Sequence, residues 1–228
     1  MKSSVIIKTF TDRYPFVGPT IWILCIQYYI TQIVVARAWS IHYSLLYNPI
    51  SDLGNTACGL YSGRFVCSPL HGLMNASFIM LGVTIAVGSF LIYQEFKENR
   101  GLLFGFSFMA VAGVGTLIVG LFPENSLSVL HTFGASLPFF IGNLSLVILG
   151  VALPVPVALR IYTLLSGLIS LVALVLFVTN LYLGLGIGGM ERIVAYPQTI
   201  WLIIFGIYIS INHIAKRPRR SKPLAESV

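Results

Sequence analysis

Six apolar runs of roughly 20 residues or slightly more constrain the fold of this chain more than any other feature. At about 1.5 Å rise per residue, an α-helix of ~20 residues crosses the ~30 Å hydrocarbon core of a bilayer. Backbone groups in lipid must be hydrogen-bonded within the protein, so such runs fold as helices. The predicted spans cover residues 15–36, 69–93, 101–121, 128–152, 158–183 and 193–214.

The charge content leads to the same conclusion. Only 9% of the residues are charged, whereas a soluble domain carries about 25%. Mean hydropathy is +0.88. Because so few charges cannot cover a water-facing surface, lipid is the expected solvent of the folded chain. We therefore predict an all-α polytopic membrane protein, built as one six-transmembrane-helix bundle.

Six spans place both termini on one side of the membrane, and the basic residues predict which side. Of the 14 Lys and Arg residues, all but three lie on the terminal side. The three exceptions are Arg37, Arg64 and Arg192. Because short cytoplasmic segments are enriched in Lys and Arg, both termini are predicted to be cytoplasmic. Residues 1–14 and the basic residues 215–228 are then cytoplasmic tails, and residues 37–67 form a structured outer loop.

A signal-peptidase site is the alternative interpretation of the first span. Ala36, Arg37 and Ala38 resemble such a site. However, the preceding run is too long for the apolar region of a signal peptide, and it contains two glutamines. We therefore predict that the first span is retained, with cleavage after Ala38 as the alternative.

Two of the three cysteines share the predicted outer loop. Cys58 and Cys67 lie there, whereas Cys25 lies inside a span. An oxidising compartment permits a disulfide between the first two. We therefore predict a Cys58–Cys67 disulfide. Two free thiols are the alternative, which a reversed orientation would favour.

The residues from Tyr47 to Asn55 carry the most distinctive polar side chains of the loop, including Ser51 and Asp52. Further ionisable side chains fall within about one or two helical turns of the same membrane interface. These are His71, Glu124, His131 and Glu191. Ionisable groups near membrane depth are costly, and they usually face a bundle interior or a wet cavity. We therefore predict an outward-facing polar pocket.

Several chemical roles fit these residues. Asp52 and His131 are predicted to be a catalytic acid–base pair, with Ser51 as a nucleophile. The predicted ligand-binding residues are His71, Glu124, Glu191, Arg192 and Tyr196. A divalent metal such as zinc is a further option, with His71, His131 and Asp52 as its ligands. The sequence identifies no other cofactor.

A structural role is the alternative for the same residues. Asp52 precedes a Leu-Gly turn, where an aspartate commonly caps a helix or ties down its own loop. His131 could hydrogen-bond Glu124 and brace two helices without any chemistry.

Residues 48–55, Asn-Pro-Ile-Ser-Asp-Leu-Gly-Asn, resemble a motif of a large prokaryotic family of six-span membrane proteins. This family is number 998 among the domains of unknown function. Further residues similar to its motifs are Cys58, 67–71, Asn75, 122–124, 131–135, Glu191, 196–197 and Trp201. The resemblance covers nearly the whole chain. It implies six spans, a prokaryotic plasma membrane and a shared site at Ser51, Asp52 and His131, but no reaction.

A more distant similarity points toward lipids. Residues 50–54 and 131–135 are similar to motifs of the eukaryotic damage-regulated autophagy modulator family and its GPI-lipid-remodelling relatives. This chain departs from the pattern at Leu53, where those proteins have a small hydroxylated residue. The similarity implies the handling of membrane lipids.

The leading prediction is that the protein binds or modifies a membrane lipid, or its headgroup, in the outer pocket. As an enzyme, it would be a lipid-directed hydrolase or transferase that uses Asp52 and His131. One alternative is a structural or interaction protein, and another is a small-solute or proton-coupled transporter, although the spans lack the repeats of many transporters. The basic residues form no face with interleaved aromatics, so membrane lipids rather than nucleic acids are the expected partners. The sequence leaves the oligomeric state open.

Overall fold

The structure is a computed structural model that describes residues 13–96 and 99–216. Most of the two predicted tails lies outside these residues. The described part is mostly helical and contains six helices that are long and apolar enough to cross a membrane, which confirms the prediction of six spans. They are Val17–Arg37 (α2, Val17–Ile23; η1, Leu24–Ile26; α3, Gln27–Arg37), His71–Tyr93 (α4), Arg100–Leu121 (α5), Ser128–Ala152 (α6, Ser128–Ser136; η3, Leu137–Gly142; α7, Asn143–Ala152), Val157–Val178 (α8) and Gly186–Lys216 (α9).

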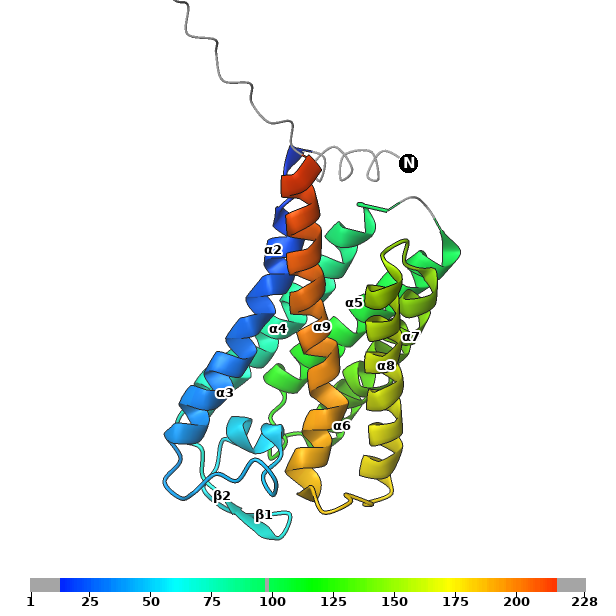
Figure 1. The fold of residues 1–228 in the computed structure, drawn as a ribbon. Helices are drawn as coiled ribbons and strands as arrows, with labels where there is room; N and C mark the ends of the chain where they lie inside the picture. The colour runs from blue at the N-terminus through cyan, green and yellow to red at the C-terminus, as the bar shows by residue number, and fades with distance from the viewer. Residues whose placement is uncertain (1–12, 97–98, 217–228) are drawn as a thin grey trace, which may run out of the picture.

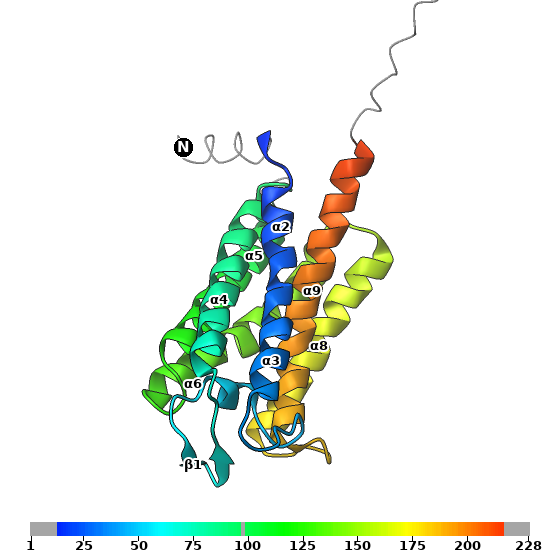
Figure 2. The same ribbon diagram turned by 90° about the vertical axis from the view of Figure 1, so that its left-hand side faces the viewer.

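The six spans form a closed ring. The first span packs against α4 and α9, and the ring continues through α5, α7 and α8 back to α9. Helix α2 begins and α9 ends at the same end of the bundle (Figure 1). We call the opposite end the hairpin end; it holds residues 38–70, 122–127 and 179–185 (Figures 1 and 2).

Aromatic side chains fill the middle of the ring. Trp22 of α2 contacts Trp201 of α9 with ring centroids 5.5 Å apart, and Phe106 of α5 at 6.1 Å. Trp201 stacks on Phe205 at 4.7 Å. Trp22, Trp201 and Phe205 are fully buried. Lipid is as apolar as these rings, so there is no hydrophobic driving force between the helices. The close packing and edge-to-face contacts of the rings hold the helices together instead.

Small residues allow α4 and α5 to approach closely. A Cβ added at Gly82 would lie 2.5 Å from the carbonyl oxygen of Gly113 and closer still to the backbone nitrogen of Leu117. A Cβ at Gly113 would meet Ala86 of α4. The spacing of Gly82 and Ala86 in the sequence is typical of such helix pairs.

Gly82→Ala is therefore expected to destabilise the bundle by about 1–3 kcal/mol, because the methyl group meets backbone that cannot rotate away. The measurement is thermal unfolding of the purified protein in detergent. Gly72→Ala is the matched control on the same helix, since a Cβ there meets nothing within 4 Å. Equal melting temperatures for both variants would contradict the close contact.

The last helix begins earlier than the sequence predicts. Helix α9 starts at Gly186 rather than near residue 193, and α8 ends at Val178 rather than residue 183. The glycine-rich stretch is helical because the loop before η2 packs on it. The backbone nitrogens of Gly188 and Gly189 both donate to the carbonyl of Leu46. Glu191 and Arg192 therefore lie on the second turn of α9.

The fourth span changes its winding half-way. Residues Leu137–Gly142 form a π-helical turn that contains Pro138, between α6 and α7. Proline removes a backbone donor, and wider turns of this kind re-aim the side chains on either side. Helix α7 packs against α8. The π-helical turn joins α7 to α6, and α6 lies toward the hairpin end (Figure 1).

Candidate functional site

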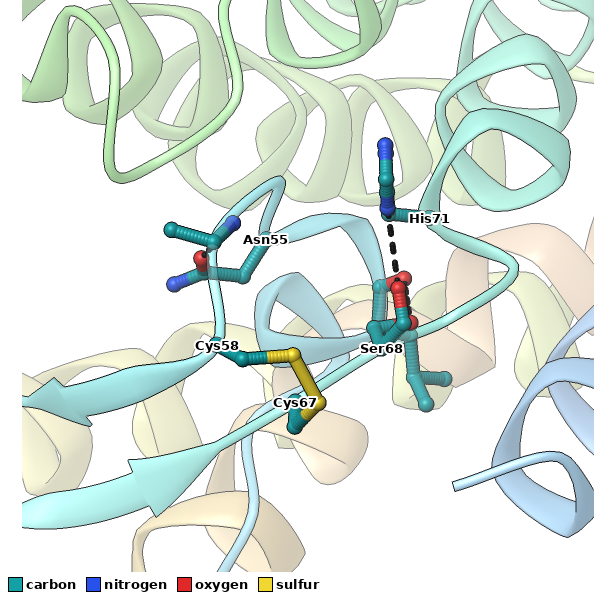
Figure 3. Close-up of a disulfide and its surroundings, with 7 residues drawn as sticks. Asn55, Cys58, Cys67, Ser68 and His71 are labelled. Carbon is teal, nitrogen blue, oxygen red and sulfur yellow. Dashed lines mark hydrogen bonds between the residues drawn. A yellow bond between two sulfur atoms is a disulfide. The ribbon is translucent and has the colours of Figure 1, made fainter. Parts of the chain in front are cut away.

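The loop between the first two spans is a compact structure at the hairpin end. The 3-10 helix η2 (Ile50–Gly54) precedes an antiparallel hairpin of β1 (Gly59–Tyr61) and β2 (Arg64–Val66). Ser62 and Gly63 form its turn with φ of 46° and 79°, as a two-residue hairpin turn with matching twist requires. The predicted disulfide Cys58–Cys67 joins the ends of the two strands (Figure 3).

Removing this disulfide is expected to lower stability by about 2–3 kcal/mol, because the reduced loop gains freedom in the unfolded chain. The measurement is thermal unfolding with and without a reductant. Reductant should lower the melting temperature of the wild type but not that of a Cys58→Ser/Cys67→Ser variant. Cys25 is a buried free thiol that both proteins keep, so any effect of the reductant on it is the same in the two samples. A wild type insensitive to reductant would contradict the prediction.

An ion pair links η2 to the hairpin. The Asp52 side chain is completely buried, and Arg64 donates to it from Nε at 2.7 Å and from Nη2 at 2.6 Å. Asn48 donates a third hydrogen bond at 3.1 Å. Burial lowers the pKa of Arg64, but the hydrogen bonds and charge of Asp52 raise it more. The Asp52 carboxylate is thus engaged by loop residues and does not pair with His131.

Ser51 contacts His131 instead. A 3-10 helix has three residues per turn, so neighbouring side chains point about 120° apart. Ser51 Oγ lies 3.0 Å from His131 Nε2, and His131 Nδ1 lies 2.8 Å from the carbonyl oxygen of Phe122. A carbonyl only accepts, so Nδ1 carries the proton and donates it to Phe122. Nε2 is then the acceptor for the Ser51 hydroxyl.

Two carboxyl groups lie close to this pair. Glu191 accepts a hydrogen bond from the backbone nitrogen of Ile50, which ties α9 to η2. Glu124 accepts from Asn55 at 3.3 Å and is itself buried. Burial, followed by the negative charge of Asp52, raises the pKa of Glu124 to about 8. At neutral pH Glu124 is therefore largely protonated and able to donate a hydrogen bond.

A cavity of about 490 Å³ opens beside Ser51 and His131; we call it the Ser51 cavity. Its polar wall includes Ser51, Arg64, Glu124, His131 and Glu191. Its apolar wall comes from η3, α8 and α9 and includes Phe139, Phe140, Leu174, Phe177, Val178 and Ile187. The cavity is thus amphipathic. Its ionisable groups lie on the loops at the hairpin end and on the adjoining ends of α6 and α9. Such a shape suits a molecule with a polar head and an apolar chain.

Other predicted site residues lie elsewhere. The ring of His71 contacts the carbonyl of Ser68 at 2.9 Å, beside the disulfide, and does not line the Ser51 cavity (Figure 3). Arg192 and Tyr196 line a different cavity, which is bounded by α3, the segment before η2 and α9. Within residues 13–96 and 99–216, no three His, Cys, Asp or Glu side chains converge as metal ligands. The predicted set of His71, His131 and Asp52 is therefore not brought together.

Sequence reasoning missed Arg64 and the aromatic wall of Phe139 and Phe177. Arg64 had a usable signal, because it is one of two basic residues in the same predicted loop as Asp52. Opposite charges in one buried loop tend to pair. The aromatic wall had none, because phenylalanine is ordinary in a membrane helix.

The comparison with protein families decides the classification. A family described as a protein of unknown function, DUF998, matches residues 23–208. The chain belongs to the DUF998 family. Neither curated proteins nor solved structures gave a match. In this DUF998 protein the matched region includes all of η2, the hairpin and the Ser51 cavity, so the family match covers the whole candidate site.

Proposed function

We propose that this protein is a membrane-embedded acyl hydrolase or acyltransferase that acts on a lipid ester in the Ser51 cavity. The observation that carries the proposal is the Ser51–His131 hydrogen bond at the polar wall of an amphipathic cavity. A serine is activated as a nucleophile by an adjacent base, and that base needs a third group to orient it. Here the carbonyl of Phe122 orients His131.

The chemistry follows from these contacts. His131 Nε2 takes the hydroxyl proton as Ser51 Oγ attacks the ester carbonyl carbon, and the bond to the alcohol breaks as His131 returns the proton to that alcohol. Water, or a second alcohol, then attacks the acyl-serine with His131 again as base. Arg64 uses Nε and Nη2 for Asp52, and it also lines the cavity, so its positive charge would favour the developing oxyanion.

The surroundings support a lipid substrate. The apolar wall accommodates an acyl chain, and Arg64 with protonated Glu124 offers donors to an ester or phosphate head. A smaller cavity of about 60 Å³, also lined by Ser51 and Glu191, is large enough for a water molecule. The disulfide supports placing this end in an oxidising compartment, and hence the termini in the cytoplasm.

Ser51→Ala is expected to lower kcat/KM for a fluorogenic phospholipid ester by at least about 10³-fold, as removal of a serine nucleophile does. A fluorophosphonate probe should label the wild type at Ser51 and leave the variant unlabelled. Ser128→Ala is the matched control, because Ser128 lines the same cavity and makes no side-chain hydrogen bond to His131 in the described part of the chain. Equal turnover in wild type and Ser51→Ala would refute catalysis.

A structural role for the same hydrogen bond is the second candidate, since it also ties η2 to α6. In that case Ser51→Ala lowers the melting temperature, and neither protein hydrolyses the ester or reacts with the probe. The two functions are thus separated by turnover and melting temperature measured on the same samples.

A further inference from the structure

A smaller cavity lies deeper in the bundle, next to the Ser51 cavity; we call it the inner cavity. It is lined by η2 and by residues of every span except α8. Ser51, Ala135, Phe139 and Glu191 line both cavities, so the two adjoin at these residues. The volume of the inner cavity, about 60 Å³, has room for a few water molecules.

The inner cavity reaches toward the middle of the membrane. Gln198 follows Glu191 by seven residues, which places it two turns along the same face of α9 and about 10 Å deeper. Trp201, one turn beyond Gln198, belongs to the aromatic packing of the ring and does not line the cavity. The inner cavity therefore ends before this aromatic packing, and its other end adjoins the Ser51 cavity.

Polar groups without a protein partner line the inner cavity. The amide of Gln198, the hydroxyl of Tyr28 and Oε1 of Glu191 make no hydrogen bond in the described part of the chain. The exposed fractions of these three residues are only 3%, 4% and 6%. Unlike the sealed amide nitrogen of Gln32, these polar atoms keep accessible surface, so a molecule in the cavity can touch them.

The mixture of donors and acceptors identifies the occupant. Gln198 and Tyr28 each offer a donor and an acceptor, and Glu191 Oε1 adds an acceptor. The Thr116 hydroxyl donates to the carbonyl of Ala112 at 3.0 Å, which leaves its oxygen free to accept. Water is a small molecule that both donates and accepts, and buried water typically makes about three hydrogen bonds to such groups. An acyl chain would leave all of these groups unsatisfied.

The neighbouring π-helical turn makes room for the Gln198 amide. A Cβ at Gly142 would collide with Gln198 Oε1, so glycine at this position lets the amide lie against η3. Wider turns of this kind are frequent at functional sites. The amide is thus placed between α9 and η3, at the deep end of the inner cavity.

We propose that the inner cavity holds bound water and supplies the molecule that hydrolyses the acyl-serine, with Gln198 as a positioning residue. The use of this water rests on the proposed function. An acyl chain in the Ser51 cavity excludes bulk water from that side, whereas the inner cavity also adjoins Ser51. The reaction is then hydrolysis to a fatty acid rather than transfer to a second alcohol.

The step that consumes the water is balanced by the Ser51–His131 pair. The water oxygen bonds to the acyl carbon while one water proton passes to His131 Nε2. The bond from the acyl carbon to Ser51 Oγ then breaks, and His131 returns the proton to Oγ. The fatty acid leaves, and Ser51 is restored.

Hydroxyl-radical labelling by X-ray radiolysis tests for the water directly, because the radicals form from water and modify the side chains beside it. We expect Phe78, which lines the inner cavity, to be labelled well above Phe106, although both rings are buried. Gln198→Met keeps the length of the side chain and removes its amide. It should bring the labelling of Phe78 down to that of Phe106. Equal labelling of both rings in the wild type overturns the water site.

A fluorogenic ester separates the two steps of catalysis. The burst of released alcohol reports acylation of Ser51, and the steady rate that follows reports loss of the acyl group. Gln198→Met should keep the burst and slow the steady rate about fivefold, the effect of one net hydrogen bond. Thr116→Val is a second variant with the same expected direction. Thr84→Val is its matched control, because Thr84 also donates to a carbonyl of its own helix but lies outside the cavity.

The outcomes separate this proposal from the proposed function. A steady rate that Gln198→Met and Thr116→Val leave unchanged overturns the supply of water from the inner cavity. Tighter binding of long-chain esters by Gln198→Met overturns it as well, because the cavity then takes the end of the acyl chain. A wild type without a burst refutes catalysis at Ser51 instead, and the labelling of Phe78 still decides whether the water site exists.

Discussion

Arg64→Ala is expected to lower the free energy of unfolding by about 3 kcal/mol. Asp52 is completely buried, and Arg64 donates two hydrogen bonds to its carboxylate, beside the one from Asn48. Removing one partner of a buried ion pair costs about 3–5 kcal/mol, because the other charge stays buried without compensation. The expected loss for Arg64→Ala lies at the low end of this range because the Arg64 side chain is 21% exposed. Denaturant unfolding in detergent measures the change.

The double variant Asp52→Asn/Arg64→Ala tests the cause of that loss. It removes the buried charge together with its partner, so it should recover part of the stability lost in Arg64→Ala. Arg100→Ala is the control for loss of an arginine, because Arg100 is exposed at the start of α5. A double variant no more stable than Arg64→Ala would show that the guanidinium matters for packing rather than for its charge.

The sequence predicts the six spans well, for a simple physical reason. Lipid tolerates only helices of a set length, so hydropathy alone locates six of them. The ends of those helices then fix the level of each polar side chain. Of the six residues of the predicted pocket, Ser51, Glu124, His131 and Glu191 line the Ser51 cavity, whereas Asp52 and His71 do not.

The partners of these residues depend on local geometry that hydropathy does not contain. Ser51 and Asp52 are neighbours in the chain, yet η2 turns one toward His131 and the other toward Arg64. A sequence pattern does not predict a five-residue 3-10 helix inside a loop. The prediction of an Asp52–His131 pair therefore had the wrong partner for each residue.

The start of α9 was missed for a related reason. The run of glycines at residues 184–189 resembles a flexible loop in sequence. In the structure the glycines allow backbone contact, because a Cβ at Gly188 would collide with the carbonyl of Asn48. This contact places Arg192 on the carbonyls of the loop and Glu191 on the backbone of Ile50. Tertiary contact thus decided a boundary that composition left ambiguous.

Glu124 makes the strongest prediction for pH. Its folded pKa of about 8 lies above the ordinary value of 4.5, through burial first and the charge of Asp52 second. Between these two pH values the native state binds more protons than the unfolded state, so stability falls as pH rises. We expect the free energy of unfolding of the wild type to fall by on the order of a few kcal/mol between about pH 5 and pH 8. The melting temperature should decline with it.

Glu124→Gln isolates this contribution, because glutamine keeps the shape of the side chain and cannot ionise. The variant should match the wild type near pH 5, where Glu124 is protonated, and exceed it in stability at pH 8. Asp52→Asn should reduce the decline only in part, since it removes the second cause and leaves burial. If Glu124→Gln declined as steeply as the wild type, the proton would reside on another group. The Ser51 cavity would then lack the neutral donor that the proposed headgroup contact requires.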